Sequence, residues 1–286
     1  MKKTVEEWLN EWLEVYVKPC KRENTYLCYK YVIKMMLKYQ ANEKGKMLAD
    51  FSEMDIQKWI NQLANDYSKS TVKKVRGILS QAYKVAMRNH LCEENPAMFI
   101  ILPEASEKIV RALTQGEQKV VEAAAKADKL GYIVLFLLLT GLRAGELINL
   151  KWEDYNRERE EIYIRSSKTK AGVRTIPLLP EAKKIIDESP HYCEYIFTST
   201  ANRRVTKIVL KRLYMRLRKK TGYTFLTNHV FRHSFATRAV ESGVDYKALS
   251  VLLGHTNVAF TLHRYTNAET DFLRKQILLL IQNKAS

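Results

Sequence analysis

Hydrophobic residues recur at helical spacing through the first hundred residues. One apolar stripe covers residues 8–17, and a second covers residues 29–37. Ser52 is placed to cap a third helix, whose apolar positions lie within 56–63, and a fourth stripe covers residues 72–86. The pattern therefore predicts a unit of four helices over residues 1–92.

The periodicity lapses over residues 93–112, where Pro96 and Pro103 would interrupt a helix. We predict that this segment is a linker between two domains. Beyond it, Thr114 and Glu117 have the spacing of a capping box, which predicts a helix from about residue 115. That helix leads into a very apolar one that ends at residues 140–141.

The rest of the chain predicts a second domain over residues 113–286. Residues 161–165 and 173–178 alternate like two strands around a turn at 167–172. Pro180 begins another helix, and the chain is again helical from about residue 203. The expected fold is mainly α, with a helical first domain and a mixed α+β second domain that contains a small antiparallel sheet.

Charge adds a candidate partner. The chain of 286 residues has a formal net charge of +17. Residues 1–107 hold 17 Lys or Arg and 14 Asp or Glu, whereas residues 108–286 hold 31 and 17. Such an excess favours a polyanion, and double-stranded DNA is the partner that we predict. A merely basic protein without such a partner is the alternative.

Cysteine use and hydropathy indicate the compartment. Cys20, Cys28, Cys92 and Cys193 are scattered without a CxxC pair, which favours reduced thiols over disulfides or a zinc site. The longest apolar run, 132–139, is far shorter than the roughly 20 residues that span a bilayer, and the first residues lack the apolar core of a signal peptide. We expect a cytoplasmic, nucleoid-associated protein with no membrane partner.

Three segments could supply the chemistry of phosphodiester exchange, which needs cations on the phosphate, a nucleophile, a base and an acid. The first contains Arg143, just after the apolar helix, and Glu146, which could orient it. The second contains His229 and Arg232, three residues apart and hence on one helical face. Each set has a structural alternative: an ordinary Arg–Glu ion pair, or a capping or core histidine.

The third segment runs from residue 253 to residue 266 and contains His255 and Tyr265. The chain has 16 tyrosines, so chemistry alone does not select one of them. His233 forms an i, i+4 pair with His229, but no HExxH pattern or third ligand accompanies the pair. We therefore expect no metal.

The sequences TGLRAGEL, HVFRHSFAT, LLGH and RYT, in this order and spacing, resemble the tyrosine recombinase (phage integrase) family. One such motif is a weak signal, and the ordered set is a strong one. The resemblance covers essentially the whole chain, because the helical first domain is similar to the core-binding domain of that family. It implies a site-specific DNA recombinase that acts on a mobile element, with no metal, ATP or other cofactor.

The resemblance also implies residue roles. Arg143 and Arg232 would hold the scissile phosphate, and Tyr265 would attack it to form a 3′-phosphotyrosyl link. His229 is similar to the general base of the family, and His255 to its second hydrogen-bonding histidine. The lysine of the family, which protonates the leaving 5′ oxygen, lies in the hairpin turn; Lys168 matches best, and Lys170 competes with it. Glu146 would have a supporting role.

We expect further DNA contacts from clustered cations in both domains; for the cluster of the second domain, a solvated surface helix is the alternative. The resemblance implies that the free protein is a monomer or weak oligomer and forms a tetramer in synapsis. It also implies that an apolar C-terminal helix docks on a neighbouring protomer; packing of this helix on its own domain is the alternative. We expect an accessory directionality factor as a further partner. The first helix is predicted to begin near Thr4, so we expect no arm-binding domain before it, either because this is a simpler recombinase or because a truncation removed that domain. The predicted DNA-contact residues are Lys69, Lys73, Lys74, Arg76, Arg203, Arg204, Lys207, Lys211 and Arg212.

Three alternatives stay open at this point. A topoisomerase with the same chemistry would relax one duplex without exchanging strands between two. A DNA-binding regulator would use the fold without catalysis, although it would have no need of the whole residue set. A metal-dependent nuclease would require a carboxylate cluster. The sequence leaves open the target site and the choice between integration, excision and dimer resolution.

Overall fold

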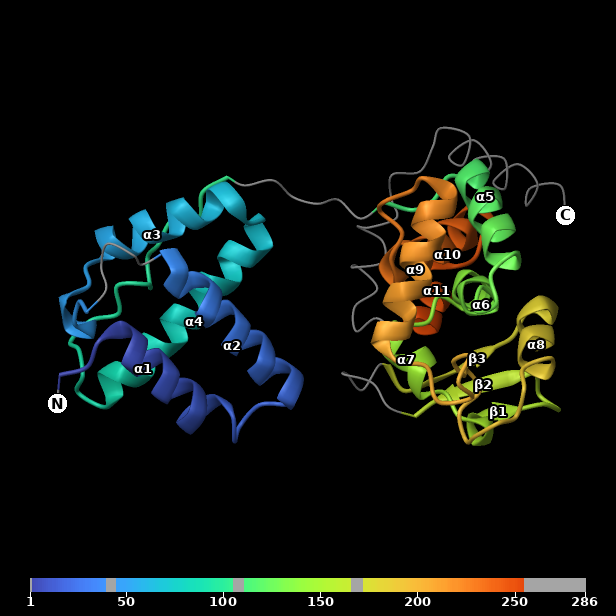
Figure 1. Ribbon diagram of the computed structural model, residues 1–286, viewed down its shortest axis with the longest axis horizontal. Helices are drawn as coiled ribbons and strands as arrows, with labels where there is room; N and C mark the ends of the chain where they lie inside the picture. Colours follow the sequence, from blue (N-terminus) through green and yellow to red (C-terminus); the bar gives the residue numbers. More distant parts are fainter. Residues whose placement is uncertain (1, 40–44, 105–110, 166–171, 255–286) are drawn as a thin grey trace, which may run out of the picture. The chain divides into compact units, whose positions relative to one another are not determined.

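The computed structural model describes residues 2–39, 45–104, 111–165 and 172–254 (Figure 1). The chain forms two compact units, residues 1–109 and residues 110–286. Each unit has its own hydrophobic core. The boundary between them falls inside the segment 93–112.

The described part of the first unit is helical and contains no β-strand. The four apolar stripes of the sequence each form an α-helix, which confirms the predicted helical first domain. A π-helical turn (Leu13–Val17) extends the first helix, so the stripe 8–17 crosses two kinds of helical geometry. The α-helices are α1 (Val5–Trp12), α2 (Glu23–Leu37), α3 (Glu53–Asp66) and α4 (Lys69–Arg88).

Ser52 caps α3 as predicted. Its hydroxyl accepts a hydrogen bond from the Asp55 N–H at 3.2 Å, and the Asp55 carboxylate accepts one from the Ser52 N–H at 2.9 Å. This reciprocal pair satisfies donors that the first turn of a helix leaves open. Lys46 donates to the same carboxylate at 2.8 Å. The Lys46 ammonium and then the Ser52 N–H lower the pKa of Asp55 to about 2.

Two tryptophans tie the helices of the first unit together. The Trp8 indole donates to the Ala82 carbonyl, and the Trp59 indole donates to the Met36 carbonyl, each at 3.0 Å. These bonds join α1 to α4 and α3 to α2 while the rings fill the core, so the polar atom of each large ring is satisfied. Ile100, from the segment predicted as a linker, is also buried in this core.

The second unit is built around α6 (Tyr132–Thr140), a helix that is apolar on every side. It contacts α5, α8 and α10, which explains why its sequence has no polar face (Figure 1). The predicted cap at Thr114 is present before α5: Thr114 and Glu117 exchange two hydrogen bonds, at 2.9 and 3.2 Å. The other helices are α5 (Gln115–Lys126), α7 (Ala144–Asn149), α8 (Pro180–Asp187), α9 (Lys207–Thr221), α10 (Asn228–Glu241) and α11 (Tyr246–Leu253).

The sheet of the second unit is antiparallel, with the order β1-β2-β3. The predicted pair corresponds to β2 (Glu161–Ile164) and β3 (Arg174–Pro177), with Ile162 opposite Ile176. The edge strand β1 (Tyr155–Asn156) was not predicted, because two residues are too few to show an alternating pattern. The fold class, mainly α with a small antiparallel sheet, is confirmed.

No helix in the described part of the chain is both long and apolar enough to cross a membrane.

Candidate active site

Arg143 lies at the junction of α6 and α7. Gly141 ends α6 in the left-handed conformation, with φ of 64°, and a Cβ there would lie 2.4 Å from the Phe235 ring. The chain is then extended at Arg143, which is the N-cap of α7. The Glu146 carboxylate accepts from the Arg143 N–H at 2.9 Å and from its guanidinium at 2.6 Å. The predicted orienting contact from Glu146 is therefore present.

Arg232 reaches the same junction from α10. Its side chain is buried, and its guanidinium donates to the Gly141 carbonyl at 2.8 Å and to the Leu253 carbonyl. The first of these bonds joins α10 to the turn before Arg143, and the second joins it to the end of α11. The sequence segments that contain Arg143 and Arg232, about 90 residues apart, thus meet in one place.

Arg174 is a third arginine of this site, and it was not singled out in the sequence. It begins β3, and its guanidinium donates to both carboxylate oxygens of Glu146, at 3.2 and 3.1 Å. It also donates to the carbonyls of Leu252 and Gly172, at 2.6 and 2.8 Å. One signal was available: Arg174 is in phase with the inward-facing residues Ile176 and Leu178, an unusual position for a charge.

The three arginines meet at the carboxyl end of α11. Arg174 donates to the carbonyl of Leu252, Arg232 to that of Leu253, and Arg143 to that of Gly254, the last at 2.9 Å. The last carbonyls of a helix have no partner within it and carry partial negative charge, so guanidinium groups are favourable there.

In the described part of the site, the Glu146 carboxylate pairs with two of these guanidinium groups, those of Arg143 and Arg174. Burial alone would raise the pKa of Glu146, but the hydrogen bonds and charges of Arg174 and Arg143 outweigh it and hold the pKa below its usual value. Glu146 is therefore ionised at neutral pH. The site keeps an excess of positive charge, and the Arg143 side chain is 36% exposed. Such an arrangement can bind an anion from solvent, and a phosphate fits the fork geometry of arginine.

The predicted histidine His229 lies in the first turn of α10, one turn before Arg232, and is exposed. Thr227 caps this helix by accepting from the Val230 N–H at 3.3 Å. Four predicted catalytic candidates lie outside the described residues: Lys168, Lys170, His255 and Tyr265. Gly172, the first described residue after 166–171, and Gly254, the last before 255–286, both accept hydrogen bonds from arginines of the site.

The predicted DNA-contact residues of the first unit lie in the first two turns of α4. Among the residues that the structure describes, none forms a hydrogen bond or ion pair with the side chain of Lys69 or Lys73. Arg76 donates to the Met98 carbonyl at 3.0 Å, and the Lys74 ammonium lies 3.8 Å from the Cys28 sulfur. Arg76 therefore has a local structural contact in addition to any contact with DNA.

The predicted DNA-contact residues of the second unit lie in α9 and just before it. Arg204 donates to the Ile148 carbonyl at 3.1 Å, and its guanidinium lies 4.8 Å from the centre of the Tyr195 ring. Lys207 and Lys211 line a groove of about 250 Å³. Its other lining residues are Ala144, Leu210, Tyr214, Arg218 and Thr227. This cationic groove adjoins the arginine site, because Ala144 follows Arg143.

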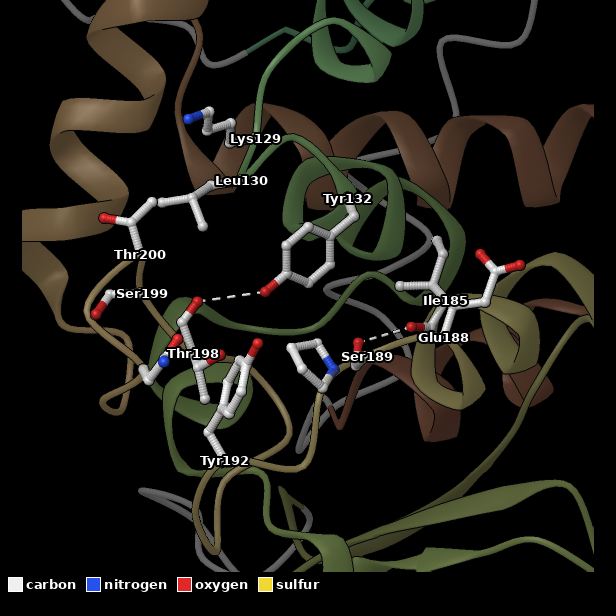
Figure 2. A pocket seen from close by; sticks show the side chains of 12 residues that line it. Lys129, Leu130, Tyr132, Ile185, Glu188, Ser189, Tyr192, Thr198, Ser199 and Thr200 are labelled. Carbon is white, nitrogen blue, oxygen red and sulfur yellow. Dashed lines mark hydrogen bonds between the residues drawn. The ribbon is translucent and has the colours of Figure 1, made fainter.

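A separate cavity of about 400 Å³ lies between α6, the end of α8 and the loop at 198–202 (Figure 2). The Tyr132 hydroxyl points across it and donates to the Thr198 carbonyl at 3.3 Å, and burial raises the pKa of Tyr132. The cavity contains none of the arginines described above. We therefore do not place the active site there.

Among the residues that the structure describes, no group of three or more His, Cys, Asp or Glu side chains could hold a metal ion.

Comparison with known proteins places the chain in a family. The model of the phage integrase family matches residues 100–271, and that of the phage integrase N-terminal SAM-like domain matches residues 4–64. The chain belongs to the phage integrase family, the tyrosine recombinases. The resemblance seen in the sequence is confirmed, and with it the enzyme class, which cleaves and rejoins DNA strands in site-specific recombination.

Individual relatives agree with this assignment. The chain is 25% identical to a XerC-like tyrosine recombinase of Caldanaerobacter subterraneus subsp. tengcongensis, over 92% of this chain and 79% of the relative. Its fold matches the Tn1549 transposon integrase in complex with a circular intermediate DNA, with a TM-score of 0.79, 21% identity and coverage of 97% and 99%. It also matches a lambda integrase tetramer bound to a Holliday junction, with a TM-score of 0.75, 23% identity and coverage of 93% and 80%.

Proposed function

We propose that Arg143 and Arg232 bind the scissile phosphate of duplex DNA, and that Tyr265 attacks this phosphate. The observation that carries the proposal is the meeting of the two arginines at the junction of α6 and α7 and the end of α11. His255 follows Gly254 directly in the sequence, and Tyr265 comes ten residues later. The scissile phosphate gains negative charge in the transition state. Bidentate hydrogen bonds from guanidinium groups therefore stabilise the transition state more than the ground state.

The reaction is a pair of transesterifications. The Tyr265 oxygen attacks phosphorus and loses its proton to His229, the bond to the 5′ oxygen breaks, and Lys168 protonates that oxygen. The products are a 3′-phosphotyrosyl link and a free 5′ hydroxyl. A 5′ hydroxyl of a second strand then attacks the link and releases the tyrosine. Because a tyrosine of ordinary pKa, about 10, is a weak nucleophile at neutral pH, the base and the arginines are both required.

The lysine assignment can be tested separately. We expect the Lys168→Ala variant not to cleave an ordinary phosphodiester. The same variant should cleave a 5′-bridging phosphorothiolate, because the thiolate leaves without protonation. Lys170→Ala serves as the matched variant. If the sulfur substrate rescues Lys170→Ala and not Lys168→Ala, then Lys170 is the acid.

DNA binding is proposed to use both units. Residues 1–92 would form the core-binding domain, residues 93–112 a linker, and residues 113–286 the catalytic domain. In the second unit, the cationic groove beside Ala144 suits a phosphate next to the scissile one, because Lys207 and Lys211 line it. In the first unit, Lys69 and Lys73 of α4 are the proposed contacts. Such contacts position the duplex without reading its sequence.

We further propose that four protomers assemble on two DNA sites, and that the natural task is integration or excision of a mobile element. The likeness to the tetramer of lambda integrase and to a transposon integrase supports this. An accessory factor would set direction, and the protein would be associated with the nucleoid.

The apolar segment after Thr266 would dock on a neighbouring protomer. Truncation after Thr266 should therefore abolish synapsis, and normal synapsis by the truncated protein would reject this docking.

A covalent-trapping assay tests the proposed chemistry. The protein is incubated in EDTA with a suicide duplex nicked near the candidate site, and the products are separated on a denaturing gel beside Tyr265→Phe. We expect a shifted covalent band with the wild type and none with the variant. A band that persists with the variant would move the nucleophile to another tyrosine, and no band on any bound DNA would favour a silent regulator.

A further inference from the structure

Arg174 is a buried charge of the site. Its side chain is 3% exposed, and that of its partner Glu146 is 4% exposed. Four hydrogen bonds, two to this carboxylate and two to backbone carbonyls, use four of its five N–H donors. A guanidinium removed from water is costly unless its donors are matched in this way.

Packing alone does not explain an arginine here. The next inward-facing residues of β3 and its extension are Ile176 and Leu178, so the position lies on the apolar face of the strand. Replacing a buried ion pair by apolar side chains of similar volume is often neutral or stabilising. The ion pair of Arg174 and Glu146 therefore points to a requirement other than stability.

Arg174 contacts both groups that hold Arg143. Glu146 binds Arg143 through the same two oxygens that accept from Arg174: Oε1 accepts from both guanidinium groups, and Oε2 accepts from Arg174 and from the Arg143 N–H. The second holder of Arg143 is the Gly254 carbonyl. A Cβ on Gly254 would lie 2.9 Å from Arg174 Nη1, so Arg174 also packs against the backbone of this residue.

The geometry of the contact matters more than its charge. Two roughly parallel bonds from a planar fork fix both the position and the rotation of a carboxylate, whereas a lysine ammonium fixes its position alone. With Arg174 in place, the carboxylate of Glu146 can face Arg143 in only one orientation. A change at Arg174 is thus transmitted to Arg143 through shared atoms.

We propose that Arg174 is a positioning residue for catalysis, which acts through Glu146 and the end of α11 to set the guanidinium of Arg143 against the scissile phosphate. The inference rests on the proposed function, in which Arg143 contacts that phosphate. Arg174 itself does not touch DNA.

The test compares cleavage of two suicide duplexes by Arg174→Lys. One duplex has an ordinary scissile phosphate, and the other has a methylphosphonate, in which a methyl group replaces one non-bridging oxygen and removes the charge. If Arg174 acts through the contact of Arg143 with the charged phosphate, a change at Arg174 should reduce cleavage of the neutral methylphosphonate less than cleavage of the phosphate. We expect a loss of about tenfold or more on the phosphate and of less than about threefold on the methylphosphonate, with DNA binding little changed.

A double-mutant cycle on the ordinary phosphate gives an independent readout. If Arg174 acts through Arg143, then Arg174→Lys should add less than about twofold to the loss caused by Arg143→Ala, because effects within one network are not additive. Thermal melting of each variant identifies a folding defect. Arg174→Lys is chosen because it keeps the positive charge opposite Glu146 and so limits such a defect. Arg174→Met serves as the harsher variant.

The outcomes separate the two proposals. Equal losses on both substrates, or full additivity with Arg143→Ala, would overturn the positioning role of Arg174, and so would unchanged cleavage by Arg174→Lys. Failure of the proposed function gives a different result, since the wild type itself would then form no covalent product on either duplex.

Discussion

Among the residues that the structure describes, the core of the first unit is apolar and aromatic, whereas all nine buried polar or charged side chains belong to the second unit. Glu146, Arg174 and Arg232 are three of these nine. Because burying a charge costs free energy unless it is paired and hydrogen-bonded, a fold selected for stability alone would avoid such a cluster. The difference separates a unit optimised for packing from a unit in which a chemical task determines part of the core.

The charged residues of the first unit act at its surface. Asp55 caps a helix and pairs with Lys46 there. The second part of the chain also has the larger net charge: +14 over residues 108–286, against +3 over residues 1–107. Both properties indicate that polyanion chemistry is concentrated in the second unit.

The largest effect is expected for Glu146→Gln. It leaves Arg174 buried without its counter-charge and should lower the free energy of unfolding of the second unit by about 3 kcal/mol or more. Hydrogen exchange resolved by peptide measures each unit separately, and Asp55→Asn is the matched change in the first unit. Similar losses for the two variants would show that the buried network has no special energetic status.

Arg232→Ala should separate binding from chemistry. We expect DNA binding within about tenfold of the wild type and covalent cleavage lower by about a hundredfold or more, because the guanidinium acts on charge that develops in the transition state. Arg232→Lys, which cannot make bidentate contacts, should show most of the same loss. Equal losses in binding and cleavage would contradict the role of Arg232 at the phosphate.

Acid should lower the free energy of unfolding of both units. In the first unit, part of this loss can be assigned to Asp55. The folded pKa of Asp55, about 2, lies below its ordinary value of 3.8, so its stabilisation is present above that value and is lost as pH falls toward 2. Urea unfolding at pH 5 and pH 3 should therefore show a smaller loss for Asp55→Asn than for the wild type. Identical losses would mean that the Asp55 cap does not contribute.

The smallest effect is expected for Ser52→Ala. Loss of the hydroxyl that accepts from the Asp55 N–H should lower the free energy of unfolding of the first unit by about 1 kcal/mol. Cleavage by the second unit should be unchanged at a temperature where the variant is folded. A loss of activity without a loss of stability would show that this cap has a functional role.

Local patterns predicted the parts of the fold that depend on local physics. The cap at Ser52, the capping box at Thr114, the apolar helix α6 and the strands β2 and β3 follow from residues close in the sequence. The contact of Glu146 with Arg143 is also local, since three residues separate them. These features could be predicted because each is stabilised by its own neighbours.

The assembly of the site could not be predicted in this way. The bond from Arg232 to the Gly141 carbonyl joins residues 91 positions apart, and that from Arg174 to Leu252 joins residues 78 apart. Spacing along one helix or strand contains no information on such contacts. The resemblance to a family indicated that Arg143 and Arg232 act together, and Arg174 was missed because its partners come from other elements.

The proposed active site is tested most directly by identifying the residue that becomes joined to DNA. The trapped complex is digested with nuclease and trypsin, and the modified peptide is sequenced by mass spectrometry. We predict a nucleotide on Tyr265, in a peptide that ends at Arg274. A nucleotide on any other side chain would contradict the proposed active site, even if the protein still cleaves and rejoins DNA.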